Sequence, residues 1–597
     1  MVELASILVL SVFAQWLAWK IKVPAILPLI VIGLSLGPLS TFFTPDGSKI
    51  FSGDAIFSGD FLFSFVSISV GVILFEGGLT LKFSEIRSQA STVRNILFFG
   101  PLFTLLGGGL AAHYIMGLDY TYAFLFGALI IVSGPTVVLP ILKNVKPNAK
   151  INTILKWEGI LIDPIGALVA LLVYEFINSG KASDVYTLEA FKEFFITLAT
   201  GVFIGALGAL FLRWSLNKNR LPHYLKNVFA LGMVILVFSF SEVLHHEAGL
   251  MASTFMGIAL ANLKVKDLKG ILSFKEDISI ILISVLFLLL SSRIEVDQMI
   301  KLGWPSLGLF AVVILIIRPL VVWTSSIKSD LTWQEKSFIS WIAPRGIVAA
   351  AVASLFSLQL IATSSTASQA AQAELILPLT FLIIVGTVVI QGSTAKPIAR
   401  WLGVERDVPK GILLIGAHAG ARKLAHILNK NGSPTLLIDT SKSNCEDAEK
   451  EGLQVLNENI LRDEFLDDFD YSDYGRLISL TPNHDINLIA LNLLKEEFSE
   501  NRVWRLISTN EKKLKDLQPE ENVAFMGLMD FDQLNAFGQS EDTIQETPIT
   551  NKDSFEEFIN SKVGIPLFLG EEDGDIKVLD HNSDFQDAKT LYYIKTR

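Results

Sequence analysis

The chain has 597 residues, of which 51% are hydrophobic and only 18% are charged, a balance that is unusual for a soluble protein. Its formal net charge of -11 argues against a nucleic-acid partner, which would require a basic face. A single cysteine, Cys445, excludes an internal disulfide framework and a cysteine metal cage. The apolar runs stop near Lys396, so we predict a membrane domain over residues 1–400, followed by soluble segments at 401–540 and 541–597.

Apolar segments of about 20 residues are long enough to cross a lipid bilayer as helices. Residues 2–18 have no basic segment before them and no clear cleavage site after them, so they are expected to form the first span rather than a signal peptide. About thirteen candidate spans are present, near 2–18, 24–39, 61–80, 93–115, 121–142, 152–177, 193–214, 227–243, 248–262, 277–292, 304–324, 337–358 and 374–395. We therefore predict a polytopic α-helical membrane protein.

Lysine and arginine are unevenly distributed between the loops. Every second loop carries most of these residues, as in Lys143, Lys146 and Lys150, whereas the intervening loops hold few. Basic loops usually face the cytoplasm. The pattern predicts a cell (inner) membrane protein with its N-terminus outside and its C-terminal domain in the cytoplasm.

The predicted span 121–142 contains a helix-breaking sequence. Ser133-Gly134-Pro135-Thr136 combines a proline, which lacks an amide donor, with a glycine, which loosens a helix. Transporters use helices broken at mid-membrane to bind ions. The sequence predicts either an ion site at this break or a simple proline kink.

Three charged residues lie within apolar spans, where charges usually mark an ion or proton path. Glu158 and Asp163 share one predicted span, and Arg345 lies in another. Five residues of helix give a rotation of about 140°, so one acid can face a cavity while the other faces a partner. We expect Asp163 to bind the cation and the proton, and Glu158 to pair with Arg345, because a buried arginine stays charged. The alternative is a structural charge network with no transport role.

Four motifs stand out in the apolar part of the chain: Phe75-Glu76-Gly77-Gly78-Leu79, Ser133-Gly134-Pro135-Thr136, Glu158 to Pro164, and Ala343-Pro344-Arg345-Gly346. In this order they resemble the motifs of monovalent cation–proton antiporters of the NhaP-like branch. The resemblance covers roughly residues 1–400 and implies a homodimer with an inverted repeat and crossed, broken helices. It also implies that Asp163 binds the cation (Na⁺ or K⁺) or the proton alternately, while Glu158 and Arg345 form a supporting ion pair.

The chain departs from this family pattern at two positions. Gly134 stands where the broken helix often has Asp, and Ile162 stands where the residue before Asp163 is often Asn. The cation must then depend on Asp163, Ser133, Thr136, backbone carbonyls and water, which would relax the choice between sodium and potassium. One titrating carboxylate predicts electroneutral, one-for-one exchange, because a cation and a proton compete for it.

Beyond the membrane domain, the pattern becomes that of an α/β unit. A buried strand at 411–415 is followed by a turn with Gly416, His418 and Gly420, then a helix and a second strand that ends in Asp439. An acidic residue about 20 positions after a glycine turn is typical of nucleotide-binding Rossmann units. These four residues are therefore the candidate nucleotide site.

The segment 409–540 resembles the RCK-type (TrkA-N-like) regulatory domains of potassium channels and transporters. Its glycine fingerprint is degenerate, since His418 and Ala421 replace the second and third glycines. Two interpretations stay open: a regulatory adenine nucleotide (AMP, ATP or NAD(H)), or a ligand-free module that contributes to dimerisation. No cofactor is expected to be required for transport.

Two regions are less informative. Residues 541–562 have a polar, loop-like composition, and short strands are predicted at 565–569, 576–579 and 591–594. Glu76 faces either an ion cavity or the membrane edge.

The buried acids favour a cation–proton antiporter, with sodium preferred, that is regulated by its cytoplasmic domain. The alternative is nucleotide-gated K⁺ transport, by a K⁺/H⁺ antiporter or an efflux channel. A channel would need a filter loop such as Thr-Val-Gly-Tyr-Gly, and the sequence contains none. No catalytic constellation accompanies the glycine turn, so an enzyme is not predicted.

Overall fold

The computed structural model of the protein forms two compact units, Met1–Arg406 and Asp407–Arg597. Below they are called the membrane unit and the cytoplasmic unit, after the predicted topology. The residues that the structure describes are 2–21, 23–46, 48–51, 60–178, 184–218, 222–263, 265, 268–364, 366–405, 409–462, 469, 471, 473–498, 502–509, 511, 522–549, 551–571, 576–583, 585 and 588–595.

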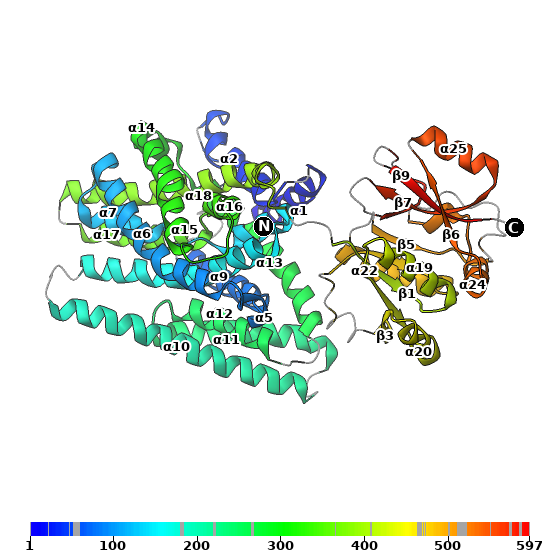
Figure 1. Cartoon of the computed structure of the whole chain (residues 1–597). Helices are drawn as coiled ribbons and strands as arrows, with labels where there is room; N and C mark the ends of the chain where they lie inside the picture. The colour runs from blue at the N-terminus through cyan, green and yellow to red at the C-terminus, as the bar shows by residue number, and fades with distance from the viewer. Residues whose placement is uncertain are drawn as a thin grey trace. The chain divides into compact units, whose positions relative to one another are not determined.

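The described part of the membrane unit is helical (Figure 1). Its elements are α1 (Val2–Ile21), α2 (Ile26–Leu36), η1 (Pro38–Phe42), α4 (Asp60–Leu79), α5 (Phe83–Ile86), α6 (Ala90–Met116), α7 (Tyr120–Leu129), α8 (Pro135–Val145), α9 (Ala149–Asn178), α10 (Asp184–Asn217), α11 (His223–Leu244), α12 (Ala248–Asn262), α13 (Leu268–Arg293), α14 (Val296–Val312), the π-helix η2 (Val313–Ile317), α15 (Arg318–Ser325), α16 (Trp333–Trp341), α17 (Ile347–Thr363) and α18 (Ala367–Leu402).

Helix length and composition confirm a membrane-embedded architecture. Within the described residues, six helices are long and apolar enough to cross a membrane, and shorter apolar helices accompany them. Large apolar side chains remain exposed on α10 and α11, among them Phe203, Leu207, Leu236 and Phe240. Such side chains suit contact with lipid tails. The expected total of about thirteen spans stays a prediction.

Two helical segments are interrupted where the sequence carries Pro and Gly. Residues 130–134 separate α7 from α8, as the Ser133-Gly134-Pro135 pattern predicts. Residues 342–346 separate α16 from α17, whereas 337–358 was expected to be a single span. Both breaks leave backbone groups without helical partners, so each must be satisfied by other parts of the protein.

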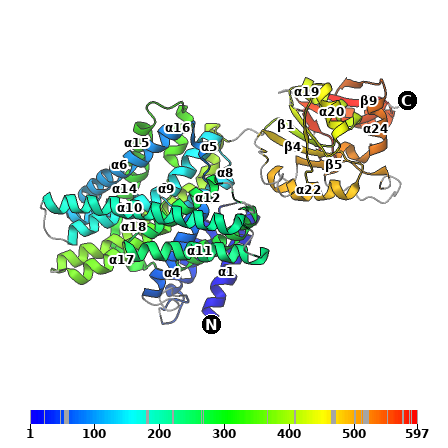
Figure 2. The same ribbon diagram turned by 90° about the horizontal axis from the view of Figure 1, so that it is seen from below.

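Helices α4, α10, α11 and α12 pack around one buried apolar cluster of the membrane unit. Figure 2 shows α10, α11 and α12 side by side on one flank of this unit. A second, larger cluster joins α4, α7, α8, α9, α16, α17 and α18. The interrupted helices and α9 therefore share one core, to which Phe238 of α11 and Leu250 and Ile258 of α12 also contribute.

The cytoplasmic unit begins with a five-stranded parallel sheet of order β3-β2-β1-β4-β5. Its elements are β1 (Gly411–Ile415), α19 (Ala419–Lys430), β2 (Thr435–Asp439), α20 (Lys442–Lys450), β3 (Gln454–Asn457), β4 (Tyr474–Ser479), α22 (His484–Phe498), β5 (Val503–Arg505), η4 (Ala524–Gly527) and α24 (Phe531–Gln539). Alternate residues of β1 pack against α19 on one face and α22 on the other, so the strand is buried on both sides. This is the predicted doubly covered α/β arrangement, and the strand order reverses beside β1.

A four-stranded antiparallel sheet of order β6-β9-β7-β8 completes the unit. Its elements are β6 (Ile544–Pro548), α25 (Lys552–Ser561), β7 (Gly564–Glu571), β8 (Ile576–Val578) and β9 (Ala588–Lys595). The three predicted short strands are present as β7, β8 and β9. The prediction of a loop at 541–562 is wrong, because β6 pairs with β9 and α25 buries Phe555 beneath it.

Candidate functional site

The two interrupted helices of the membrane unit touch at a pair of glycines. A Cβ atom on Gly346 would lie 2.6 Å from the Cα atom of Gly134, and a Cβ atom on Gly134 would lie 2.9 Å from the Cα atom of Gly346. Side chains cannot be accommodated at such distances from backbone atoms. Glycine at both positions therefore allows the two unwound segments to cross in direct contact.

The Asp163 side chain lies beside this crossing. Its Oδ2 atom would be 3.4 Å from a Cβ atom on Gly134, and the Oγ1 atom of Thr136 would be 3.0 Å from the same point. Asp163 is 1% exposed, and Ser133 and Thr136 are also buried. Among the described residues, neither Asp163 Oδ1 nor Thr136 Oγ1 has a hydrogen-bond partner. A buried carboxylate oxygen without a donor is costly, and a bound cation or proton would remove that cost.

The second buried acid, Glu158, forms an ion pair with Arg318 of α15. Arg318 Nη2 donates to Glu158 Oε2 over 2.9 Å, and Nη1 donates to Oε1. The same guanidinium donates to the carbonyls of Ile339 and Ile342, where α16 ends. Both side chains are buried, and the two parallel bonds have the fork geometry that makes arginine–carboxylate pairs strong.

The predicted Glu158–Arg345 ion pair is therefore corrected. In the described part of the chain, the hydrogen-bonded partner of Glu158 is Arg318. Arg345 Nη1 instead donates to the Ile131 carbonyl over 3.0 Å, just after α7 ends. The physical reason is that α7 and α16 each end inside the protein with unsatisfied carbonyl groups, and each end receives one arginine.

Residues of α18 hold the second unwound segment in place. The Arg345 amide donates to Thr387 Oγ1 over 3.1 Å, and the Ala343 amide donates to Gln391 Oε1 over 3.0 Å. Both acceptors are buried. These bonds satisfy amides that the break leaves free, and they fix the backbone around Gly346.

A cavity of about 520 Å³ extends from Lys143 and Lys146 to the start of α8, next to the crossing. Pro135 and Thr136 contribute to its lining, as do Lys143 and Lys146 at the end of α8. Glu76 also lines it, so of the two positions left open for this side chain, the structure favours the cavity. The cavity therefore extends from Thr136 to the lysines at the end of α8.

A separate pocket of about 320 Å³ lies at the carboxyl ends of the parallel strands in the cytoplasmic unit. Gly416, His418 and Asp439 line it, as the sequence predicts. Gly420 does not. A Cβ atom on Gly420 would lie 2.3 Å from the Leu534 carbonyl oxygen, so this glycine serves the close packing of α19 against α24.

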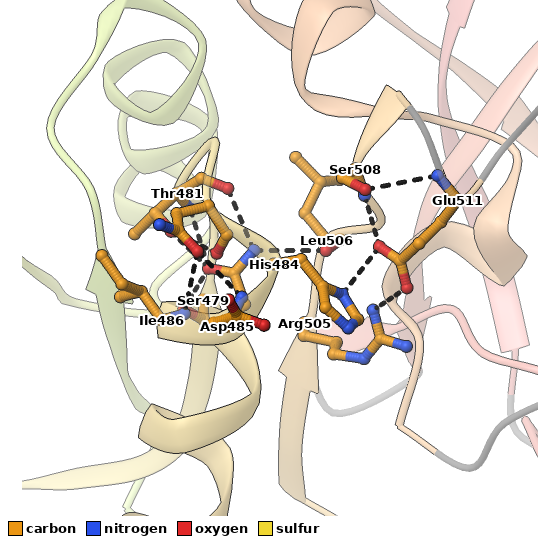
Figure 3. Close-up of polar contacts among 11 residues, drawn as sticks. Ser479, Thr481, His484, Asp485, Ile486, Arg505, Leu506, Ser508 and Glu511 are labelled. Atoms are coloured by element: carbon orange, nitrogen blue, oxygen red, sulfur yellow. Dashed lines mark hydrogen bonds and ion pairs between the residues drawn. The ribbon is translucent and has the colours of Figure 1, made fainter.

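The turn between β4 and α22 forms one wall of this pocket and is held by a hydrogen-bond network (Figure 3). Asn487 Oδ1 accepts from the Thr481 amide over 3.1 Å, and Asn487 Nδ2 donates to the Leu506 carbonyl over 3.3 Å. Next to it, Glu511 binds both Arg505 and His484. Burial alone would raise the pKa of Glu511, but the hydrogen bonds from Ser508 and Arg505 and the charge of Arg505 lower it below its usual value. The wall is therefore held by hydrogen bonds and ion pairs within the protein itself.

Comparison with known families agrees with both units. Residues 7–401 match the family model "Sodium/hydrogen exchanger, transmembrane", and residues 412–520 match the TrkA-N domain. The first match covers well over half of the chain. The chain belongs to the sodium/hydrogen exchanger family.

Individual relatives of this exchanger are distant in sequence. A probable Na⁺/H⁺ antiporter 2 of Methanocaldococcus jannaschii is 25% identical over 354 residues, which is 55% of this chain and 82% of the relative. The K⁺/H⁺ antiporter NhaP of Alkalimonas amylolytica is 24% identical over 408 residues, which is 67% of this chain and 66% of the relative. The solved sodium proton antiporter MjNhaP1 of M. jannaschii at pH 8 aligns with a TM-score of 0.57 at 23% identity, over 67% of this chain and 97% of that chain. The structural match shows a shared fold.

The exchanger is a transporter rather than an enzyme, as predicted. Sequence reasoning missed Arg318. The signal was available, because Arg318 is a charge inside the apolar run 304–324 and is followed by proline. It also follows the π-helical segment η2, a feature that is common at functional sites.

Proposed function

We propose that this exchanger is a secondary antiporter that moves a monovalent cation, Na⁺ or K⁺, in one direction and a proton in the other. The observation that carries the proposal is the buried Asp163 carboxylate beside the Gly134–Gly346 crossing, with one oxygen that no described donor satisfies. A proton or a cation relieves this situation, but both cannot occupy the same oxygen. Competition for one carboxylate couples the two fluxes.

Neighbouring groups are suited to complete the cation's coordination shell. Ser133 and Thr136 are buried near Asp163, and unwound backbone supplies carbonyl oxygens. Hard monovalent cations prefer such oxygen ligands. Glycine at 134 contributes no side-chain oxygen, so we infer a site with modest discrimination between sodium and potassium. The names of the relatives from M. jannaschii and A. amylolytica, a Na⁺/H⁺ and a K⁺/H⁺ antiporter, make both ions candidates.

The exchange is proposed to be electroneutral. Glu158 is held by Arg318 and contributes no second exchangeable carboxylate, which leaves Asp163 to carry either one cation or one proton. The rate should then be unchanged when the membrane potential is clamped with a potassium ionophore. A rate that follows the imposed potential would contradict this stoichiometry.

Access and regulation follow from the two units. The cavity that reaches Thr136 opens beside Lys143 and Lys146, which the positive-inside rule assigns to the cytoplasm, and this supports the proposal of an inward-open state. We propose a homodimer in the cell membrane whose cytoplasmic unit adjusts transport by binding a ligand that contains a nucleoside in the pocket beside β1. A channel is not favoured, because the buried carboxylate suits exchange rather than continuous conduction.

The test is proton flux in proteoliposomes that contain a pH dye, on addition of Na⁺ or K⁺. Wild type should change the internal pH with at least one of these ions, and Asp163→Asn should not. Asp297→Asn is the matched control, because Asp297 is an exposed carboxylate in the first turn of α14. Equal flux in wild type and Asp163→Asn would remove Asp163 as the carrier.

A further inference from the structure

The pocket of the cytoplasmic unit lies where dinucleotides bind in Rossmann-like folds, at the switch point of the parallel sheet. In that family of folds the pyrophosphate sits on the glycine turn, at the N-terminus of the first helix. In this protein that helix is α19 and the turn is Gly416 to Gly420. A phosphate group could bind here only if the turn offered space, free amide donors and a favourable charge.

His418 closes the crevice in which a pyrophosphate would lie. Its Nε2 atom is 2.9 Å from the Leu480 carbonyl oxygen, so the ring extends from the β1 turn to the end of β4. The ring also packs edge-on against Phe531 of α24, with 4.8 Å between ring centroids. Burial lowers the pKa of His418, so the imidazole is neutral at physiological pH and offers no positive charge to an anion.

Helix α24 packs directly against the Gly420 amide in the first turn of α19. A Cβ atom on Gly538 would lie 2.2 Å from the Gly420 nitrogen, which leaves no space for a ligand atom between the two helices. The Ala417 amide already donates to Asp439 Oδ2 over 2.8 Å. The amides of Ala417 and Gly420 are therefore not open to a phosphate at this turn.

The other two helices that begin at this edge are capped by the protein itself. Asn483 Oδ1 accepts from the amides of Asp485 and Ile486 in the first turn of α22. Ser441 Oγ accepts from the Asn444 amide in the first turn of α20. Side-chain caps satisfy the donors that would otherwise attract an anion.

The charge of the pocket also opposes phosphate. Asp439 and Glu458 line it, and none of its described lining residues is cationic at neutral pH. The guanidinium of Arg422 is near the turn, but it is engaged with Glu451 over 2.8 Å and with the Ala417 carbonyl over 2.9 Å. A phosphate in this pocket would meet two carboxylates with no counter-charge.

What remains fits an uncharged sugar and base. Asp439 accepts from the amides of Ala417 and Ser441 and from Asn444 Nδ2, so about one of its four acceptor positions is left for a hydroxyl. Glu458 supplies a second carboxylate, and Ile438 and other isoleucines provide apolar contact. The volume of about 320 Å³ is at the lower end of the roughly 300–1,000 Å³ typical of small-molecule sites.

We propose that this pocket binds a ribonucleoside without phosphate groups and excludes NAD(H) and ATP. This proposal deepens the regulatory role proposed above and rests on it for its biological meaning. The ribose hydroxyls lie on Asp439 and Glu458, and the base lies against the isoleucines and the neutral amide side chains. The family's usual dinucleotide does not fit, because its phosphate subsite is filled by His418 and α24.

The test is calorimetric titration of the detergent-solubilised full chain with adenosine, AMP, ATP and NADH. Adenosine should bind at least about tenfold more tightly than AMP, and ATP and NADH should show no saturable binding. NADH or ATP binding as tightly as adenosine would overturn the proposal. Absence of binding by adenosine and by guanosine, cytidine and uridine would overturn the nucleoside assignment.

Two variants make the test specific. Glu458→Gln, at an exposed side chain, should weaken adenosine binding without affecting folding, and an unchanged affinity would contradict the assigned ribose contact. His418→Gly should reduce the preference for adenosine over AMP, whereas His426→Gly, on α19 but outside the pocket lining, should not. Titration requires no ion flux, so its failure leaves the antiport assay unaffected, and failure of antiport would not alter the titration.

Discussion

Arg318 binds both carboxylate oxygens of Glu158, across 160 residues of sequence, and also binds the carbonyl end of α16. Arg345 binds the carbonyl end of α7, by donating to the Ile131 carbonyl. Each interrupted helix therefore has its negative end neutralised by one arginine. This arrangement leaves Asp163 as the acid near the crossing that is not engaged in an ion pair among the described residues.

Glu158→Gln should lower the thermal unfolding midpoint of the detergent-solubilised protein strongly, because it leaves the Arg318 guanidinium buried and unpaired. Removing one member of a buried pair typically costs about 3–5 kcal/mol. Arg345→Gln should cost less, since the observed hydrogen bond of its guanidinium goes to a neutral carbonyl, that of Ile131. Double-mutant cycles of Glu158 with Arg318 and with Arg345 measure which arginine is coupled more strongly to Glu158 in the free energy of unfolding. Coupling of Glu158 to Arg345 that exceeds its coupling to Arg318 would contradict the observed pairing.

Gly346→Ala should abolish transport and lower the unfolding midpoint, because the new methyl group would lie 2.6 Å from the backbone of Gly134. Gly232→Ala on α11 is the matched control, since a Cβ atom there meets nothing within 4 Å. Flux in proteoliposomes and thermal unfolding measure the two effects. Normal flux in Gly346→Ala would show that the two unwound segments do not need to touch.

Thr136→Val should raise the cation concentration for half-maximal flux about tenfold while leaving the fold intact, because it removes a hydroxyl with no described protein partner but keeps the side-chain volume. Thr136→Ser keeps the hydroxyl and should restore much of the affinity. If Val and Ser variants behave alike, the hydroxyl does not contact the cation.

Protection of the glycine turn in the cytoplasmic unit should depend on pH. The pKa of His418 is lowered in the folded state by burial, so the unfolded state binds more protons as the pH falls through about 6.5, and folding stability is lost below that value. Hydrogen exchange of peptides covering α19, corrected for intrinsic rates, should therefore become faster as the pH falls from about 7.5 to about 5.5, roughly one unit either side of the ordinary histidine pKa. His418→Gln should flatten this dependence, whereas His426→Gln should retain it.

Local patterns predicted the elements that depend on neighbouring residues. Gly134 and Pro135 located the first interruption, and the apolar run 411–415 with its following turn located β1 and the pocket. The error at 541–562 had a detectable signal, because Phe555 and Ile559 are spaced for one helix face and Asn551 caps the helix. Short polar elements of this kind are stabilised by packing, which local composition does not reveal.

Long-range pairings could not be obtained in the same way. Glu158 had two candidate arginines, Arg318 and Arg345, and nothing in one sequence states which guanidinium reaches it. The packing of α24 over Gly420 is likewise a tertiary contact between segments more than 100 residues apart. The sequence could have indicated Arg318 as a functional candidate, because it is a charged residue in an apolar span, but it could not have indicated the partner of Arg318.

The central claim is that a cation and a proton compete for Asp163. Its most direct test is proton release when Na⁺ or K⁺ is added to weakly buffered, detergent-solubilised protein near the pH of half-maximal transport. The account predicts that wild type and Asp297→Asn release protons on saturable cation binding, approaching about one proton per cation. Asp163→Asn should release none. Equal proton release from Asp163→Asn would contradict the account, because another group would then be exchanging the proton for the cation.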